Sequence, residues 1–178
     1  MPMSTLDWSP FVLAEKGESL LAPRSIDTIG GIGDRIRIAA FSERMAIHAF
    51  TWAANHYQDA TTELKETWLS LSQEEGNHYS WLMKRMKELS IDPAERKVSD
   101  RLWDSFLACK TARDFSLYMA TAEHRGMIAG ETVAKKLKFA DPETSQIFGK
   151  IAFEEIKHVE YALKYFPDLK SDFEKKTK

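Results

Sequence analysis

Two Glu-x-x-His patterns constrain the fold of this chain more than any other feature of its sequence. They are the only two in the 178 residues and lie at Glu75–His78 and Glu155–His158. Each follows another glutamate, Glu43 or Glu123, by 32 residues, so the two halves of the chain repeat with an offset of 80 residues. Because residues three apart on a helix share one face, each pattern can direct a carboxylate and an imidazole to one point.

These glutamates and histidines interrupt stripes of apolar residues. In four stretches apolar residues recur every three or four positions, which predicts four amphipathic helices. Thr111 with Asp114, and Asp141 with Pro142, have the residue types and spacing of helix starts. The expected helices cover about 34–58, 62–89, 112–140 and 142–166.

The expected fold class is all-α, a four-helix bundle made of two antiparallel helical hairpins. Short turns make the helices of each pair antiparallel neighbours. The segment 90–112 is long enough to return along a bundle of ~40 Å as a crossover, even with a short helix from Ser99 to Cys109. We expect the bundle at residues 32–167, an N-terminal arm packed on it at 1–31, and a charged, frayed C-terminal tail at 168–178.

Composition argues against several other classes of protein. The net charge is −2 and no long basic run is present, which argues against nucleic-acid binding. Cys109 is the only cysteine, so an intrachain disulfide and a cysteine-based zinc or iron–sulfur site are excluded. No stretch has the apolar length of a membrane span, and no segment resembles a signal peptide. We therefore expect a soluble cytoplasmic protein with no membrane partner.

The interrupted stripes indicate a buried metal site. Six ionisable side chains inside an apolar bundle would be unfavourable without partners, and divalent cations offset that cost because carboxylate and imidazole are their ligands. Four carboxylates suit iron or manganese better than zinc. A mononuclear or zinc site and a metal-free core of buried Glu–His or Glu–Arg pairs stay open as alternatives. The candidate ligands are Glu43, Glu75, His78, Glu123, Glu155 and His158.

This pattern resembles that of the ferritin-like di-iron and di-manganese carboxylate superfamily. In those bundles two helices supply one Glu each and the other two supply Glu-x-x-His. The segments Phe41–Ile47, Glu123–Gly126 and Glu154–Val159 also resemble an uncharacterised bacterial branch of the superfamily, which often has a histidine where this chain has Phe41. The resemblance implies a ferritin-like fold with two bound metal ions: iron, manganese or a mixed pair.

The resemblance also implies a role for each candidate ligand. The implied roles are bridging for Glu75 and Glu155, terminal oxygen ligation for Glu43 and Glu123, and terminal nitrogen ligation for His78 and His158. Glu74 and Glu154 directly precede the bridging glutamates. We expect each of them to accept the N–H of the histidine from the other half and so to orient its ring.

The function expected from this resemblance is that of a di-iron oxidoreductase. It would use dioxygen or peroxide and an external electron donor to hydroxylate or desaturate an unknown organic substrate. Ferroxidase or catalase-type peroxide removal is the second interpretation, and a non-enzymatic metal-binding or helical interaction module is the third. Iron-storage ferritins carry a short fifth helix, which the mostly polar residues after Pro167 are not expected to form. Rubrerythrin-type peroxidases carry a cysteine-ligated iron module, which Cys109 alone cannot build.

Three further features concern partners and packing. The bundle plan also resembles a tRNA hydroxylase, so tRNA is the one nucleic acid kept as a possible partner. A second apolar stripe on the first helix is covered either by the arm or by the second copy of a homodimer; it consists of Phe41, Met45, His48 and Trp52. Gly126 and Gly130 either permit a close helix approach or line a substrate channel. The histidines expected to pack or to face solvent are His48, His56 and His124.

Overall fold

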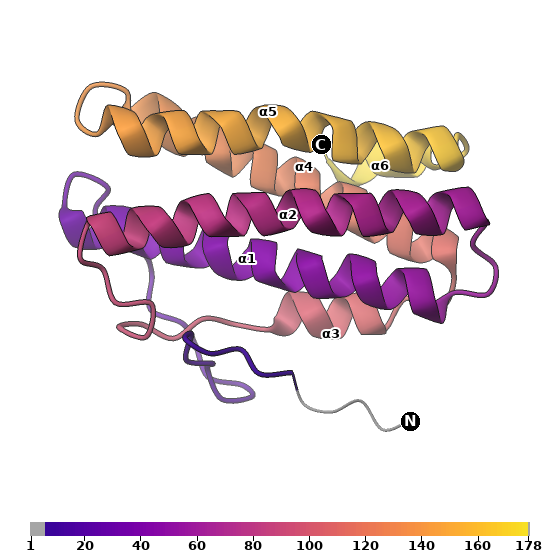
Figure 1. Cartoon of the computed structure of the whole chain (residues 1–178), viewed down its shortest axis with the longest axis horizontal. Helices are drawn as coiled ribbons and strands as arrows, with labels where there is room; N and C mark the ends of the chain where they lie inside the picture. The colour runs from indigo at the N-terminus through magenta and orange to yellow at the C-terminus, as the bar shows by residue number, and fades with distance from the viewer. Residues whose placement is uncertain (1–5, 178) are drawn as a thin grey trace.

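Four long helices form the body of the molecule in the computed structural model, which describes residues 6–177 (Figure 1). They are α1 (Ile29–His56), α2 (Thr62–Glu88), α4 (Ala112–Leu137) and α5 (Pro142–Tyr165). Two short helices, α3 (Arg101–Leu107) and α6 (Leu169–Lys176), lie in the crossover and after the bundle. Residues 6–177 contain no β-strand, so the predicted all-α bundle is confirmed. None of the helices in this range is long and apolar enough to cross a membrane.

The long helices pair as the two predicted hairpins. Helix α1 packs along α2, and α4 packs along α5. Between the hairpins the chain runs back beneath the bundle through α3, so that α2 and α4 point in the same direction (Figure 1). The facing surfaces bury apolar side chains such as Phe50, Leu82, Phe115 and Phe148. The predicted candidate ligands lie between the two hairpins, within this apolar core.

Side-chain caps fix the starts of all four long helices, and on α1 the hydroxyl of Thr28 accepts a hydrogen bond from the N–H of Gly31. Oγ1 of Thr111 accepts a hydrogen bond from the N–H of Asp114 at 3.0 Å, and Oδ1 of Asp141 accepts one from the N–H of Thr144 at 3.1 Å. The hydroxyl of Thr61 caps α2 in the same way. These bonds satisfy donors that have no partner within the helix. The helix starts predicted at Thr111 and Asp141 are therefore confirmed.

Helix α1 begins at Ile29 rather than at the predicted Asp34. The glycines just before Asp34 lie inside the helix, where they let other segments approach it closely. A Cβ on Gly31 would lie 1.7 Å from the carbonyl oxygen of Ser25, and one on Gly33 would lie 2.9 Å from a side-chain carbon of the crossover. Glycine is required here by close packing, in a helix that tolerates it.

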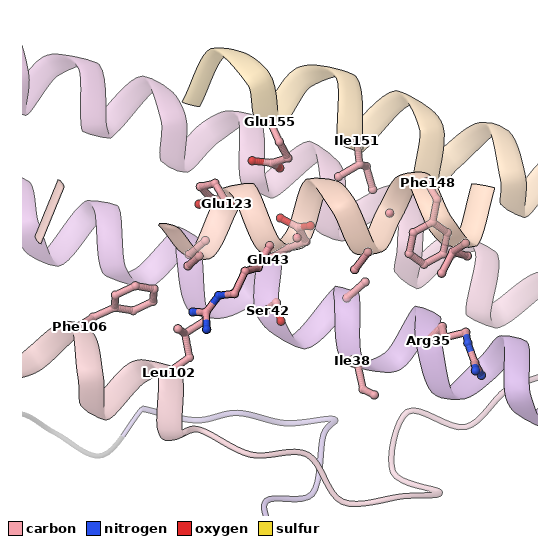
Figure 2. A pocket seen from close by; sticks show the side chains of 18 residues that line it. Arg35, Ile38, Ser42, Glu43, Leu102, Phe106, Glu123, Phe148, Ile151 and Glu155 are labelled. Carbon is pink, nitrogen blue, oxygen red and sulfur yellow. The ribbon is translucent and has the colours of Figure 1, made fainter. Parts of the chain in front are cut away.

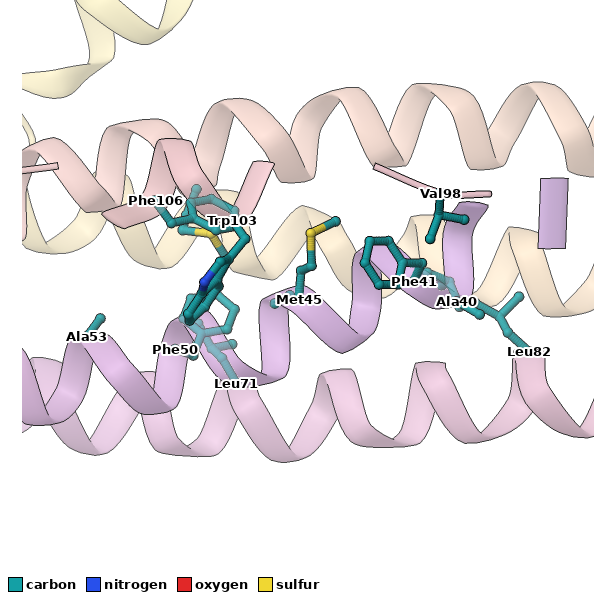
Figure 3. Packing of buried hydrophobic residues seen from close by; sticks show 14 of the residues in the cluster. Ala40, Phe41, Met45, Phe50, Ala53, Leu71, Leu82, Val98, Trp103 and Phe106 are labelled. Atoms are coloured by element: carbon teal, nitrogen blue, oxygen red, sulfur yellow. The ribbon is translucent and has the colours of Figure 1, made fainter. Parts of the chain in front are cut away.

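The N-terminal arm covers one side of α1. Trp8 and Phe11 are buried, and their rings pack edge-on against Phe41 with centroid distances of 5.3 and 5.2 Å. Backbone hydrogen bonds join residues 12–14 of the arm to Val98 of the crossover. Figure 3 shows Val98 and the α3 side chains Trp103 and Phe106 directed toward α1. The apolar stripe around Phe41 is thus covered by the arm and crossover. Residues 6–28 of the arm contain no helix, and residues 1–5 lie outside the described part.

Helix α6 forms where the sequence predicted a frayed tail, so that prediction was wrong. The side chain of Leu169 is buried, and the carboxylate of Asp168 accepts a hydrogen bond from Nε of Arg113 at 2.8 Å. The ring of Phe173 lies edge-on to His124 at 5.4 Å. These contacts dock α6 on α4. Single apolar residues among many charges made this amphipathic turn hard to distinguish from a solvated end.

A cluster of charged residues around buried Asp34 and Arg37 joins the arm, α1 and the crossover. Asp34 is 3% exposed, and its carboxylate accepts hydrogen bonds from Arg24, Arg37 and Arg96. Glu95 accepts hydrogen bonds from Arg24 and Arg37. Burial would raise the pKa of the Asp34 carboxyl, but the hydrogen bonds and charges of Arg24 and Arg96 lower it. The carboxylate of Asp34 therefore stays ionised, and the cluster joins the arm and the crossover to α1.

Candidate metal centre

The six predicted ligand residues meet halfway along the bundle. Helices α1 and α4 each supply one glutamate, and α2 and α5 each supply a Glu-x-x-His pair. Possible ligand atoms form two groups, and within each group one atom of every residue lies within 4.8 Å of the others. The groups are Glu43, Glu75, His78, Glu155 and Glu75, Glu123, Glu155, His158. Glu75 and Glu155 belong to both groups, which is the arrangement of residues that bridge two metal ions.

Both histidines direct Nδ1 toward the shared glutamates. Nδ1 of His78 lies 3.2 Å from Oε2 of Glu75 and 3.2 Å from Oε1 of Glu155. Nδ1 of His158 lies 2.8 Å from Oε1 of Glu75 and 2.9 Å from Oε2 of Glu155. The two imidazole centroids are 6.0 Å apart. Each histidine thus faces one oxygen of each shared glutamate, and the twofold repeat of the sequence becomes a twofold arrangement of atoms.

Burial leaves several polar atoms of this centre without hydrogen bonds. Glu75, His78, Glu155 and His158 are at most 3% exposed. Five buried side-chain atoms among the described residues have no hydrogen-bond partner, and four of them lie here: Oε1 of Glu75, both carboxylate oxygens of Glu155 and Nδ1 of His158. These atoms contact each other or His78 at 2.8–3.2 Å as ion pairs, without the geometry of hydrogen bonds. Metal ions at this point would bind all four atoms, so the residues present fit a metal centre.

Burial and neighbouring charges shift the pKa values of these groups. Burial raises the pKa of Glu43 well above its usual range, and the charge of Glu75 raises it further. Burial and the charge of Glu155 raise the pKa of Glu123 in the same way. Burial would also raise the pKa of Glu75, but contact with the two imidazoles lowers it. Burial disfavours charged His158, yet its contacts with Glu155 and Glu75 raise its pKa to about 12. The buried carboxylates therefore make positive charge favourable at this point.

A carboxylate from the other half of the chain holds each imidazole on its outer side. Nε2 of His78 lies 2.8 Å from Oε2 of Glu154, and Nε2 of His158 lies 3.4 Å from Oε2 of Glu74. These are the cross-bundle contacts expected from the sequence. A hydrogen on Nε2 leaves the lone pair of a neutral imidazole on Nδ1, directed at the centre. The role of Glu74 and Glu154 in orienting a metal-bound ring stays a prediction.

The other three histidines lie outside the centre. The ring of His48 packs edge-on against Trp8 at 5.4 Å, and His56 stacks on Trp52 at 4.3 Å. His124 packs against α6. Among the described residues, none of the three belongs to a group of possible metal ligands. The packing role predicted for them is confirmed.

An apolar groove leads from the surface to three carboxylates of the centre. It has a volume of about 360 Å³ and lies between α1 and α4, with side chains of α5 and α3 completing its walls (Figure 2). Glu43, Glu123 and Glu155 line it, and most of the other lining side chains are apolar. Figure 2 shows these glutamates between Arg35 at one end and Phe106 at the other.

Gly126 and Gly130, for which the sequence left two roles open, have different roles in the structure. A Cβ on Gly126 would meet no atom within 4 Å, so this glycine leaves the groove open. A Cβ on Gly130 would lie 3.4 Å from the Cβ of Ala152, so that glycine lets α4 and α5 approach closely. Sequence reasoning missed the lining residues Arg35 and Arg125, because helical periodicity does not report the spacing between two helices.

The fold and the centre define a class: a ferritin-like helical bundle whose core carries a carboxylate–histidine cluster suited to metal ions. The chain belongs to the family described as "Protein of unknown function (DUF455)", which matches residues 19–177. No curated protein matches the chain in sequence.

The fold is similar to that of the bacterioferritin-related protein from Bacteroides fragilis, a dodecameric thioferritin. The two structures have a TM-score of 0.67 over 83% of this chain and 91% of that chain, with 18% sequence identity. At this identity the likeness shows the fold alone. It confirms the ferritin-like fold, and together with the family match it confirms the predicted place in a ferritin-like branch.

Proposed function

We propose that this protein binds two metal ions, iron or manganese, and oxidises an organic substrate with dioxygen or peroxide. The observation that carries the proposal is the groove, which is open to solvent and reaches Glu43, Glu123 and Glu155. Small-molecule sites are typically concave and apolar with a few polar groups. A route for metal ions alone would instead be lined by charged or polar groups.

In this proposal the bundle holds the metal ions through residues of all four long helices. Glu43, Glu75, His78 and Glu155 would hold one ion, and Glu75, Glu123, Glu155 and His158 would hold the other. Iron or manganese bound there would supply redox chemistry with dioxygen or peroxide. The carboxylates of Glu74 and Glu154 keep each imidazole in place, and the surrounding apolar core limits the access of water.

Hydroxylation of one C–H bond by such a centre would consume one molecule of dioxygen, two electrons and two protons. One oxygen atom of dioxygen enters a C–H bond of the substrate, and the other leaves as water. An external donor supplies two electrons and two protons per turnover. The groove would hold the substrate beside Glu43 and Glu123, where its C–H bonds lie close to the centre.

Metal content is the first test of the proposal. Protein purified from iron- and manganese-supplemented cultures is expected to contain about two metal ions per chain, as in other ferritin-like carboxylate bundles. A Glu75→Ala, Glu155→Ala double variant is expected to lose both ions, because it removes the residues shared by the two groups. A Glu66→Ala, Glu160→Ala variant changes exposed residues of the same two helices and is the matched control. Metal-free wild-type protein that is folded would contradict the proposal.

Oxygen consumption separates the proposed activity from its alternatives. An oxidase acting on an organic substrate consumes oxygen catalytically only with a reductant and a suitable substrate. A ferroxidase consumes oxygen in proportion to added Fe(II), and helix α6 favours this second candidate because a short helix after the bundle is a feature of ferritins. Bound metal with no consumption of oxygen or peroxide would leave a metal-binding module.

A further inference from the structure

We propose that the groove between α1 and α4 binds an elongated apolar molecule with one anionic group, such as a medium-chain carboxylate. The apolar part would lie along the groove beside Glu43 and Glu123, Arg35 at one end would attract the anionic group, and Arg125 would add positive charge to the groove. This inference rests on the proposed function for its chemistry. The binding itself can be measured without turnover.

The walls of the groove are suited to a hydrocarbon. Ile38 on α1 is 47% exposed, and Ala129 on α4 is also exposed, while Phe148 and Ile151 form a buried base on α5. A ligand would cover apolar surface that now faces solvent, which favours binding by about 25 cal/mol per Å² of apolar area covered. A cavity of ~150 Å³ holds benzene. A groove of about 360 Å³ therefore has room for about twelve carbons.

Gly126 keeps the middle of the groove free. It follows Glu123 by three residues, so it lies on the same face of α4 as that candidate ligand. Because a Cβ at this position meets nothing within 4 Å, a larger side chain would enter the groove without displacing the backbone. A glycine inside a helix is unfavourable by roughly 0.5–1 kcal/mol relative to alanine. The open space it provides is a reason for its presence.

Two arginines are the positively charged side chains that line the groove. Arg24, Arg37, Arg85, Arg96 and Arg113 all pair with carboxylates. Among residues 6–177, no carboxylate lies within ion-pair distance of the other four arginines, and two of these, Arg35 and Arg125, line the groove. Nη1 of Arg35 donates hydrogen bonds of 2.7 Å to the carbonyl oxygens of Arg24 and Gly31, which holds the guanidinium at one end of the groove (Figure 2).

The charge of these arginines selects the ligand class. Bound divalent metal ions would balance the four glutamates of the centre, so the guanidinium groups would be the uncompensated charges of the groove. Guanidinium groups bind carboxylates in preference to neutral groups. The anionic group of a ligand therefore distinguishes the proposed class from a simple hydrocarbon or a cationic lipid.

Calorimetric titration with dodecanoate, dodecan-1-ol and dodecyltrimethylammonium tests the proposal on manganese-loaded protein. Dodecanoate is expected to bind about tenfold more tightly than dodecan-1-ol, since a hydrogen bond to a charged group contributes at least that factor. The cation is expected to bind more weakly than either. A Gly126→Leu variant is expected to lose dodecanoate binding at least tenfold while it keeps its manganese content.

The same titrations include a control variant and a variant without the two arginines. Thr132→Leu adds the same side chain at an exposed position of α4 outside the groove and is expected to bind dodecanoate like the wild type. Arg35→Gln combined with Arg125→Gln is expected to bind dodecanoate and dodecan-1-ol equally. If Gly126→Leu does not fold, Ala129→Leu fills the same groove from the next turn of α4.

Three outcomes would overturn the proposal. One is a dodecanoate Kd weaker than about 1 mM in the wild type, which is negligible affinity. The others are unchanged binding after the groove is filled, and unchanged preference for the carboxylate after both arginines are replaced. Failure of the proposed function is a separate result, because dodecanoate binding with no oxygen consumption would leave the ligand site intact and remove only the oxidase activity.

Discussion

The two ring nitrogens of each core histidine have different partners. Nδ1 faces the carboxylates common to both groups, and Nε2 faces Glu154 or Glu74 on the outer side. A carboxylate at this outer position fixes the tautomer and orientation of a ligand histidine. The contact of His78 with Glu154, at 2.8 Å, is shorter than that of His158 with Glu74, at 3.4 Å. The two halves of the centre are therefore not equivalent.

Replacing Glu154 by alanine is expected to weaken metal binding by ~10–100-fold, because His78 loses the acceptor that orients its ring. Glu74→Ala is expected to weaken it less, since its contact with His158 is longer. Competition of each variant with a chromophoric chelator for Mn(II) measures the affinity. Glu160→Ala, at an exposed position of α5, is the control. Equal affinities for the Glu154→Ala and Glu160→Ala proteins would contradict an orienting role.

The meeting of the six candidate ligands could be predicted from the sequence. The helical period fixes the face on which Glu75 and His78 lie, and the 80-residue offset fixes the equivalent level on the other hairpin. The groove could not be predicted in this way. Its width depends on how far α1 stands from α4, and this distance is set by side chains of α3 and α5 that are remote in sequence. Arg35 and Arg125 acquire a common role only through that spacing.

At the scale of elements, the Asp34 cluster joins the arm and the crossover to α1. Arg37 is 1% exposed and donates a hydrogen bond of 2.9 Å to Asp34. Asp34→Asn is expected to lower the free energy of unfolding by about 3 kcal/mol, because the buried guanidinium groups lose their carboxylate. Denaturant unfolding at pH 7 measures the change. Asp104→Asn, at an exposed position of α3, is the control and is expected to change stability by less than about 0.5 kcal/mol.

The loss of stability caused by Asp34→Asn is expected to depend on pH. The folded state lowers the pKa of Asp34 below its unfolded value of 3.8, so the ionised carboxylate stabilises the fold above that value. This stabilisation is lost as the pH falls below 3.8 toward the folded-state pKa. The difference in unfolding free energy between wild type and Asp34→Asn is expected to be constant from pH 7 to about 5 and to shrink below about pH 4. A difference that grows on acidification would contradict this assignment.

The long helices were predictable as elements because caps and periodicity agree. Thr111 and Asp141 start α4 and α5 as their residue types indicate. The early start of α1 was missed because a glycine in a sequence can indicate either a bend or a close contact. Only the structure, with Ser25 beside Gly31, shows that this glycine permits a close contact. Helix α6 was missed because its stability depends on docking against α4, which local sequence does not reveal.

At the scale of the whole molecule, the structure is a bundle with a cover on one side. The arm and the crossover lie over α1, whereas the groove opens between α1 and α4. Trp8 links these covering segments, since its ring packs against Phe41 of α1 at 5.3 Å and Trp103 of α3 at 5.8 Å. The candidate metal centre lies inside the bundle, and residues 6–28 of the arm contribute no possible ligand to it. The described part of the arm can therefore contribute to stability without contributing a residue to the metal centre.

This separation predicts the effect of removing the main anchor of the arm. Trp8→Ala is expected to lower the free energy of unfolding by ~3–5 kcal/mol, because it opens a cavity between the arm, α1 and α3. Leu21→Ala, at a side chain 78% exposed, is the control and is expected to have little effect. Denaturant unfolding gives the stability, and elemental analysis of the folded protein gives the metal content, which is expected to equal that of the wild type. Loss of metal from folded Trp8→Ala protein would show instead that the arm supports the centre, through Phe41 and the α1 turn that carries Glu43.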